Sequence, residues 1–185
     1  MVALKKRLCA KTNFTIVLLL FPVVLSAFLA EATGQDEFLD DSAKRSKIDS
    51  MYAKYRKSFS EVSDISAEQA LGFLEEGRVI FVDVRKPEEQ EVSMLPGAIT
   101  DKAFLENLTA YAHYRVIGYC TISYRSGKLA QKLKKKGINM RNLRGGILAW
   151  LHAGGKVYKE GKPVNRVHVY GRKWDLAPSA YEAVR

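Results

Sequence analysis

The amino-acid sequence predicts an α/β fold with a central, mostly parallel sheet of about five strands, flanked by helices on both faces. The first observation is a pair of short, nearly unbroken apolar runs at 79–84 and 115–119, which is the pattern of strands buried on both faces. The second is the helical spacing of apolar residues in neighbouring segments. Strands that alternate with helices form parallel sheets, which bind ligands at the carboxyl ends of their strands.

Composition limits the class of protein. The chain has 185 residues, 47% of them hydrophobic, and a net charge of +10, which suits one medium-sized domain with extensions. The charge favours anionic partners or acidic lipid, although we interpret it first as a solvated basic surface. No recognisable nucleic-acid-binding motif accompanies it, so nucleic acid is not an expected partner. Neither the two cysteines, Cys9 and Cys120, nor the three histidines show metal-ligand spacing, so no metal or cofactor is expected.

Residues 1–32 are typical of an export signal. Four basic residues, at positions 5, 6, 7 and 11, precede an apolar run at 14–30, and Ala30-Glu31-Ala32 fits the small-x-small cleavage pattern. The run is also near the lower length limit of a transmembrane helix, so an uncleaved anchor with its basic end in the cytoplasm stays open. In either case we expect an exported protein, periplasmic or anchored in the inner membrane and facing the periplasm.

Residues 33–60 are expected to be a polar linker followed by a packing helix. The stretch at 33–47 is polar and mixed in charge. Beyond it, apolar residues recur at helical spacing and predict a helix laid against the domain. These residues are Ile48, Met51, Tyr52, Tyr55 and Phe59.

The domain itself is expected at 61–155. Its first helix should begin at Ser66, which can form a capping box with Gln69, and end at Gly77. Asp83 interrupts the strand at 79–84, and an acid inside a buried strand needs a partner. The other expected elements are a turn and short strand at 95–99, a helix at 104–111, a strand at 115–119, a helix at 128–136, a strand at 138–143 and a short helix at 147–151.

The C-terminal extension at 156–185 is expected to pack on the domain. Residues 164–170 have the composition of an edge strand, and Trp174, Leu176 and Tyr181 are candidate anchors for the tail. Tyr170 and Trp174 have a second interpretation, in which they line the mouth of the active site or bind a partner. Packing is the interpretation we prefer.

Cys120 is the candidate nucleophile. It follows the apolar strand at 115–119 and precedes Arg125 and a helical segment. A loop at a helix N-terminus presents backbone N–H groups and partial positive charge. Together with a guanidinium, these groups favour the thiolate form that makes a cysteine nucleophilic. The alternative is a buried structural cysteine at the end of a core strand.

Four motifs, in this order, resemble the rhodanese family. They are Asp83-Val84-Arg85 with Pro87-Glu88-Glu89; Leu95-Pro96-Gly97-Ala98-Ile99; the loop from Tyr119-Cys120 to Arg125-Ser126, which is similar to C-x-x-G-x-R-S; and Gly145-Gly146 with Ala149-Trp150. The resemblance covers roughly residues 60–155. It implies that the predicted α/β fold is rhodanese-like and that the protein is a single-domain sulfurtransferase.

The resemblance also implies roles for individual residues. Cys120 would attack a sulfane sulfur, carry it as a persulfide and pass it to a thiophilic acceptor. The donor would be thiosulfate, a polysulfide or a persulfide, and the acceptor a thiol or cyanide. Arg125 would help to hold an anionic donor, and Asp83 and Arg85 would brace the site. Backbone N–H groups would surround the persulfide, and the loop that carries them comprises Thr121, Ile122, Ser123, Tyr124 and Arg125.

Ser123 departs from the family pattern, because the loop usually has glycine at this position. If the position needs a positive φ, serine costs on the order of 1 kcal/mol or more. The loop is then either slightly reshaped, or the Ser123 hydroxyl bonds the sulfur. The donor preference depends on which of these holds.

Two other functions stay open. One is a catalytically idle rhodanese-like module that binds a periplasmic or membrane partner, although inactive members usually lack the cysteine that this chain keeps. The other is a phosphatase or arsenate reductase on the same fold. Phosphatases and arsenate reductases related to the rhodanese family use a seven-residue loop, whereas the loop from Cys120 to Arg125 has six residues. The smaller loop suits sulfur better than phosphate or arsenate.

Overall fold

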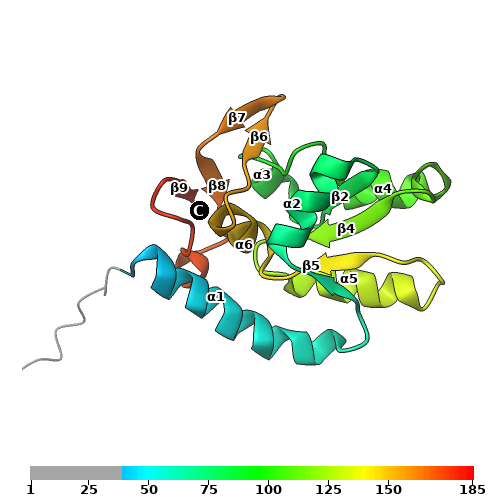
Figure 1. The fold of residues 1–185 in the computed structure, drawn as a ribbon, viewed down its shortest axis with the longest axis horizontal. Helices are drawn as coiled ribbons and strands as arrows, with labels where there is room; N and C mark the ends of the chain where they lie inside the picture. Colours follow the sequence, from blue (N-terminus) through cyan, green and yellow to red (C-terminus); the bar gives the residue numbers. More distant parts are fainter. Residues whose placement is uncertain (1–38) are drawn as a thin grey trace, which may run out of the picture. The chain divides into compact units, whose positions relative to one another are not determined.

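The centre of the fold is a five-stranded sheet (Figure 1), in a computed structural model that describes residues 39–185. Its strands lie in the order β1-β5-β4-β2-β3, and every adjacent pair is parallel. The predicted fold class is therefore confirmed. The strands are β1 (Asp64–Ile65), β2 (Val79–Asp83), β3 (Ile99–Thr100), β4 (Arg115–Tyr119) and β5 (Arg141–Leu143).

Helices cover both faces of this sheet. They are α1 (Asp41–Arg56), α2 (Ala67–Glu76), α3 (Pro87–Gln90), α4 (Asp101–Glu106), α5 (Tyr124–Lys134) and α6 (Gly146–His152). The chain also has three short 3-10 segments among these residues, η1 (Lys57–Phe59), η2 (Leu108–Tyr111) and η3 (Arg172–Trp174). Among the helices of residues 39–185, none is long and apolar enough to cross a bilayer. The predicted signal or anchor at 1–32 lies outside the described residues.

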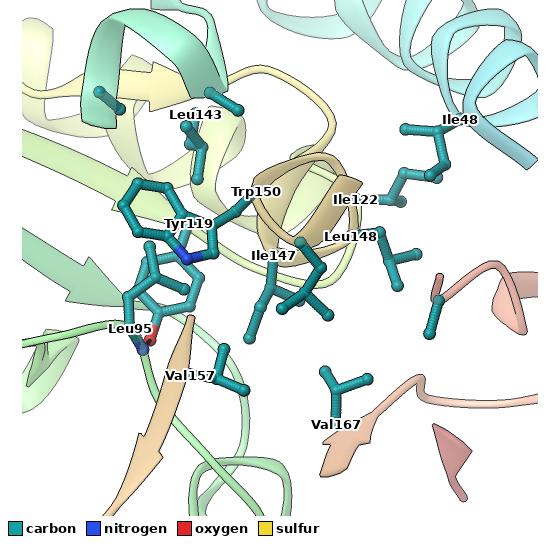
Figure 2. Close-up of a cluster of buried hydrophobic side chains, with 14 of the residues drawn as sticks. Ile48, Leu95, Tyr119, Ile122, Leu143, Ile147, Leu148, Trp150, Val157 and Val167 are labelled. Carbon is teal, nitrogen blue, oxygen red and sulfur yellow. Dashed lines mark hydrogen bonds between the residues drawn. The ribbon is translucent and has the colours of Figure 1, made fainter. Parts of the chain in front are cut away.

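The side chains of the central strands alternate between two buried clusters. Phe81 of β2 and Ile117 of β4 belong to the cluster that contains α2 and α6, whereas Val82 belongs to the cluster that contains α4 and α5. Figure 2 shows Ile147 and Trp150 of α6 within the first cluster. Burial on both faces explains why these strands are apolar runs without alternation.

The capping residues in the sequence predicted both ends of α2 correctly. The Ser66 hydroxyl accepts from the Gln69 N–H at 3.2 Å, and the Gln69 side chain accepts from the Ser66 N–H at 3.1 Å. This is the predicted capping box. Gly77 follows the helix with φ +79°, a conformation that glycine adopts without steric cost.

Several predicted boundaries were wrong. The helix predicted at 104–111 is divided: α4 begins at Asp101, where the Thr100 hydroxyl caps it through the Ala103 N–H, and ends at Glu106, before η2. α1 begins at Asp41 rather than at residue 48, because Asp40 caps it through the Ala43 N–H at 2.7 Å; part of the expected linker is therefore helical. α5 begins at Tyr124, directly after the Cys120 loop, rather than at residue 128. β5 covers only Arg141–Leu143 of the predicted strand at 138–143.

The C-terminal extension forms two small sheets of its own. β6 (Val157–Lys159) and β7 (Lys162–Val164) are an antiparallel pair, and β8 (Arg166–His168) and β9 (Glu182–Val184) are a parallel pair. The single edge strand predicted at 164–170 is therefore wrong. The reason is tertiary: β8 pairs with residues near the end of the chain, which no local pattern reveals. Val157, Val167, Val169, Leu176 and Ala177 are buried in the same cluster as α6.

Candidate active site

Cys120 directly follows β4, at the carboxyl edge of the parallel sheet. The residue is only 2% exposed. Its carbonyl oxygen accepts from the Ile147 N–H at 2.9 Å, which ties it to the start of α6. A Cβ at Gly146 would overlap this same carbonyl oxygen, and Gly146 has φ +60°. The close approach of α6 to the Cys120 backbone therefore requires glycine at this position.

The backbone N–H groups that follow Cys120 are unpaired. Within the described part of the chain, none of the N–H groups of residues 121–126 donates to another protein group. Yet Thr121 and Ile122 are each only 3% exposed and Ser123 is fully buried. A buried donor without an acceptor costs about 1–3 kcal/mol. A row of such donors beside a cysteine, at the N-terminus of α5, is suited to a bound anion.

Ser123 has the positive φ that the sequence raised as a possibility. Its φ is +80°, and it lies at the N-terminal boundary of α5. The hydroxyl donates to the Leu143 carbonyl oxygen at 2.5 Å, so it is directed at β5 and not at a sulfur on Cys120. The hydrogen bond to Leu143 offsets part of the backbone strain, because a net hydrogen bond contributes about 0.5–1.5 kcal/mol.

Arg125 forms a two-point ion pair with Glu89. Its Nη1 and Nη2 lie 2.6 and 2.7 Å from the two Glu89 carboxylate oxygens. Nη2 also donates to Thr121 Oγ1 at 3.1 Å, and the Thr121 hydroxyl donates to Glu89 at the same distance. Glu89 comes from α3, where Pro87 occupies the first turn. This network holds the guanidinium against the loop.

The electrostatics of the pair favour both charged forms. Burial opposes the charge of Arg125, but the hydrogen bond to Glu89 and the negative charges of Cys120 and Glu89 raise the pKa of Arg125. Burial likewise opposes the charge of Glu89, but Arg125 and the Lys86 N–H lower the pKa of Glu89. Through its hydrogen bond to Thr121, the residue that follows Cys120, Arg125 places positive charge at the Cys120 loop.

Asp83 and Arg85 form a buried, hydrogen-bonded ion pair, which we call the Asp83–Arg85 fork. Arg85 Nε and Nη2 donate to the two Asp83 carboxylate oxygens at 2.9 and 2.7 Å. Arg85 Nη2 also donates to the Ser93 carbonyl oxygen. The Tyr119 hydroxyl donates to Asp83 at 2.6 Å and accepts from the Leu95 N–H at 3.1 Å. Burial, followed by the Asp83 charge, raises the pKa of Tyr119 well above its usual value.

The structure thus brings every predicted site residue to one edge of the sheet, but it gives Tyr124 a peripheral place. Tyr124 is 43% exposed, and its ring packs 5.4 Å from that of Tyr55 in α1. Sequence reasoning missed the contacts of Glu89 and Tyr119. Glu89 belonged to a recognised motif, and Tyr119 adjoins the cysteine, but the partner of each lies 36 residues away.

The comparisons with known proteins identify a domain family for part of the chain. The model of the family described as rhodanese-like domain matches residues 66–153. This segment is a rhodanese-like domain. Its bounds include the Asp83–Arg85 fork, Glu89, the Cys120 loop and α6, so the rhodanese-like domain contains the whole candidate site. The comparison with curated proteins gave no match.

Several solved structures are similar to the domain. A thiosulfate sulfurtransferase from Pseudomonas aeruginosa aligns with a TM-score of 0.50 and 18% identity, over 63% of this chain and 23% of that chain. A Bacillus halodurans protein aligns with a TM-score of 0.46 and 24% identity, over 60% of this chain and 86% of that chain. The polysulfide-sulfur transferase homodimer from Wolinella succinogenes aligns with a TM-score of 0.45 and 17% identity, over 60% and 88%.

Residues 39–185 hold no group of three or more His, Cys, Asp or Glu side chains placed to bind a metal ion. Cys120 is a free cysteine in this part of the chain. The sulfur, the unpaired N–H groups and the Arg125 charge are features of this site that can take part in chemistry.

Proposed function

We propose that the protein is an exported sulfurtransferase that carries sulfane sulfur as a persulfide on Cys120. One observation carries the proposal. Cys120 directly follows a buried strand of a rhodanese-like domain, and a row of unpaired backbone N–H groups comes after it. The first three residues of this row, 121–123, are at most 3% exposed. Such donors need an anion, and a persulfide on the adjacent sulfur would supply one.

The reaction has two displacement steps. In the first, the Cys120 thiolate attacks the outer sulfur of the donor, an S–S bond forms, and the bond between that sulfur and the rest of the donor breaks. With thiosulfate, sulfite leaves with the bonding electron pair. In the second, an acceptor thiolate or cyanide attacks the terminal sulfur and regenerates the Cys120 thiolate. The products of the second step are a new persulfide or thiocyanate.

Each part of the site has a role in this scheme. N–H groups aimed at a developing anion are worth about 3 kcal/mol each in comparable acyl-transfer sites. Arg125 adds positive charge beside Cys120, and Glu89 fixes its orientation through both carboxylate oxygens. The Glu89 charge also offsets part of the Arg125 charge. We therefore infer that Arg125 orients the sulfur anion more than it captures a dianionic donor, so singly charged persulfides are expected as donors beside thiosulfate and polysulfides.

Export is part of the proposal. The apolar run at 14–30 after a basic N-terminus supports a periplasmic location or an anchor in the inner membrane facing the periplasm. The intact mass of the protein from cell fractions tests this. Loss of residues 1–32 in a periplasmic fraction supports a cleaved signal, whereas the full-length mass in a membrane fraction supports an anchor. A full-length protein in the cytoplasm would overturn export.

The sulfur chemistry is tested by intact mass. The full chain with Cys9→Ser is reduced, mixed with thiosulfate and measured with and without cyanide; Cys9→Ser/Cys120→Ser is the matched control. We expect one added sulfur, lost to cyanide with release of thiocyanate, and none in the control. If neither thiosulfate, a polysulfide nor a persulfide donor adds sulfur to the folded protein, the proposal is wrong.

A second function would then take its place. The 2% exposure of Cys120 and the pairing of Arg125 with Glu89 also suit a catalytically idle module that binds a periplasmic or membrane partner. That role does not depend on the sulfur. Binding to an envelope partner that is unchanged in Cys120→Ser, together with no sulfur uptake, would favour it.

A further inference from the structure

The Arg125 guanidinium is also contacted by an aromatic ring from outside the rhodanese-like domain. Its central carbon lies 5.2 Å from the centre of the Tyr170 ring. A cation at this distance from an aromatic face is attracted by the ring quadrupole. The Arg125 side chain is 29% exposed, so the contact is only partly screened by water. Glu89 and Tyr170 therefore both hold the same guanidinium.

Tyr170 is held in an unusual backbone conformation. Its φ is +68°, which costs a residue with a Cβ about 1 kcal/mol or more. The Tyr170 N–H donates to His168 Nδ1 at 3.0 Å, and the ring meets Trp174 edge to face at 5.2 Å. Tyr170 nevertheless stays 49% exposed. A strained residue with so little buried area gains little from packing, and its best-placed charged partner is Arg125.

The elements around Tyr170 fix its position. Val169 is fully buried, and its N–H donates to the Val184 carbonyl oxygen at 2.9 Å. Leu176 follows η3 and is 1% exposed. The segment is therefore anchored to the core on both sides of the exposed ring. The C-terminal extension presents Tyr170 to the active site in a defined place.

We propose that Tyr170 is a positioning residue of the active site, whose ring keeps the Arg125 guanidinium against the Cys120 loop. The inference deepens the proposed sulfur transfer and rests on it. It assigns the C-terminal extension a part in the reaction, because the extension supplies a contact to Arg125 that the rhodanese-like domain does not. The ring acts through Arg125 and does not itself touch the reacting sulfur.

The test compares two alkylating reagents on the full chain with Cys9→Ser. In both reactions the Cys120 sulfur attacks carbon and iodide leaves, but iodoacetate is anionic and iodoacetamide neutral. The ratio of the two rates therefore reports positive charge near the sulfur, independently of sulfur transfer. Tyr170→Leu removes the π face and keeps apolar bulk, whereas Tyr170→Phe keeps the face. Tyr114→Leu is the control, since Tyr114 is 46% exposed and pairs with Tyr111 at 6.1 Å.

We expect Tyr170→Leu to lower the iodoacetate-to-iodoacetamide ratio roughly two- to fivefold, the size that a partly exposed cation–π contact supports. The rate of sulfur transfer should fall with it, while Tyr170→Phe and Tyr114→Leu match the parent protein. An unchanged ratio in Tyr170→Leu, or an equal loss in Tyr170→Phe, would overturn the inference. So would an equal gain with both reagents, because the ring would then only cover the site. If the parent protein takes up no sulfur, the proposed function fails, but the ratio still tests the contact.

Discussion

Arg125 and Glu89 are 36 residues apart in the chain, yet they meet through two hydrogen bonds of 2.6 and 2.7 Å. Arg125 stands in the first turn of α5, and Glu89 stands in α3. The pair therefore joins the segment after β2 to the segment after β4, at the edge of the sheet where Cys120 lies. Because Glu89 is only 1% exposed, its carboxylate would be a poorly solvated charge without Arg125.

Glu89→Gln is expected to destabilise the protein in a pH-dependent way. Breaking a buried ion pair costs about 3–5 kcal/mol. The pKa of Glu89 is lowered in the fold from the ordinary value of 4.5, so its contribution is present above that value and is lost as pH falls through the lowered pKa. In urea unfolding, the free energy of unfolding of Glu89→Gln should be about 3 kcal/mol lower than that of the parent protein at pH 7. This difference between the two proteins should become smaller in acid.

Glu88→Gln is the control for this change. Glu88 adjoins Glu89, but its side chain is 60% exposed and lies 3.6 Å from an equally exposed Lys86 ammonium. Surface pairs of this kind contribute about 0–1 kcal/mol. A stability gap for Glu89→Gln that stays constant across the acid range would contradict the assigned pKa direction.

We expect Ser123→Gly to be more stable than Ser123→Ala, which is the reverse of the usual order for glycine and alanine. Ser123→Gly relieves the strain of φ +80° but loses the hydrogen bond to Leu143, so the net change should stay within about 1 kcal/mol. Ser123→Ala loses the same hydrogen bond and keeps the strain, which should cost about 1–2 kcal/mol. Denaturant unfolding of both variants checks the order. Alanine more stable than glycine at this position would show that the strain is not the deciding cost.

Gly146→Ala should damage both stability and the Cys120 loop. Its Cβ would overlap the Cys120 carbonyl oxygen and lie 2.7 Å from that of Thr121, so backbone must move. We expect a loss of about 3 kcal/mol or more, at the upper end of single substitutions. Gly154→Ala is matched in conformation, with φ +87° and nothing within 4 Å of the added carbon. It should cost only about 1 kcal/mol; equal losses would mean that the clash is relieved at no cost.

Tyr119 and Asp83 are expected to behave as one unit. Tyr119→Phe removes the hydroxyl that joins Asp83 to the Leu95 N–H, and a stranded buried partner costs about 1–3 kcal/mol. Asp83→Asn weakens the fork with Arg85. The double variant should be less destabilised than the sum of the single variants by about 0.5–3 kcal/mol. Unfolding free energies of all four proteins give this difference, and strict additivity would argue against the shared network.

The sequence predicted the architecture well because the signals for it are local. Apolar runs identified β2 and β4, and the Ser66 capping box located the start of α2. Ordered motifs identified the Cys120 loop, and the identity of residue 123 raised the question of its φ. Each of these inferences needs only residues that are close together in the chain.

Pairings across long stretches of chain were not predictable in the same way. Thr121 lies 32 residues from Glu89, and the Ser123 hydroxyl reaches Leu143, 20 residues away. β8 pairs with β9, for example at Arg166 and Glu182. The strand predicted at 164–170 was therefore too long, because only residues 166–168 of it form β8. These contacts depend on tertiary geometry that a single sequence does not encode in its periodicity.

The parallel pair of β8 and β9 consists of only three residue pairs. Sheets this small have little cooperativity of their own and belong among the segments of a protein that open most readily. Tyr170 lies two residues after the end of β8, so opening of this pair would release the ring from Arg125 while the central sheet stays folded. On slow heating, activity is therefore expected to decline several degrees before the far-ultraviolet signal of the domain, and native-state hydrogen exchange should be fastest at residues 166–184.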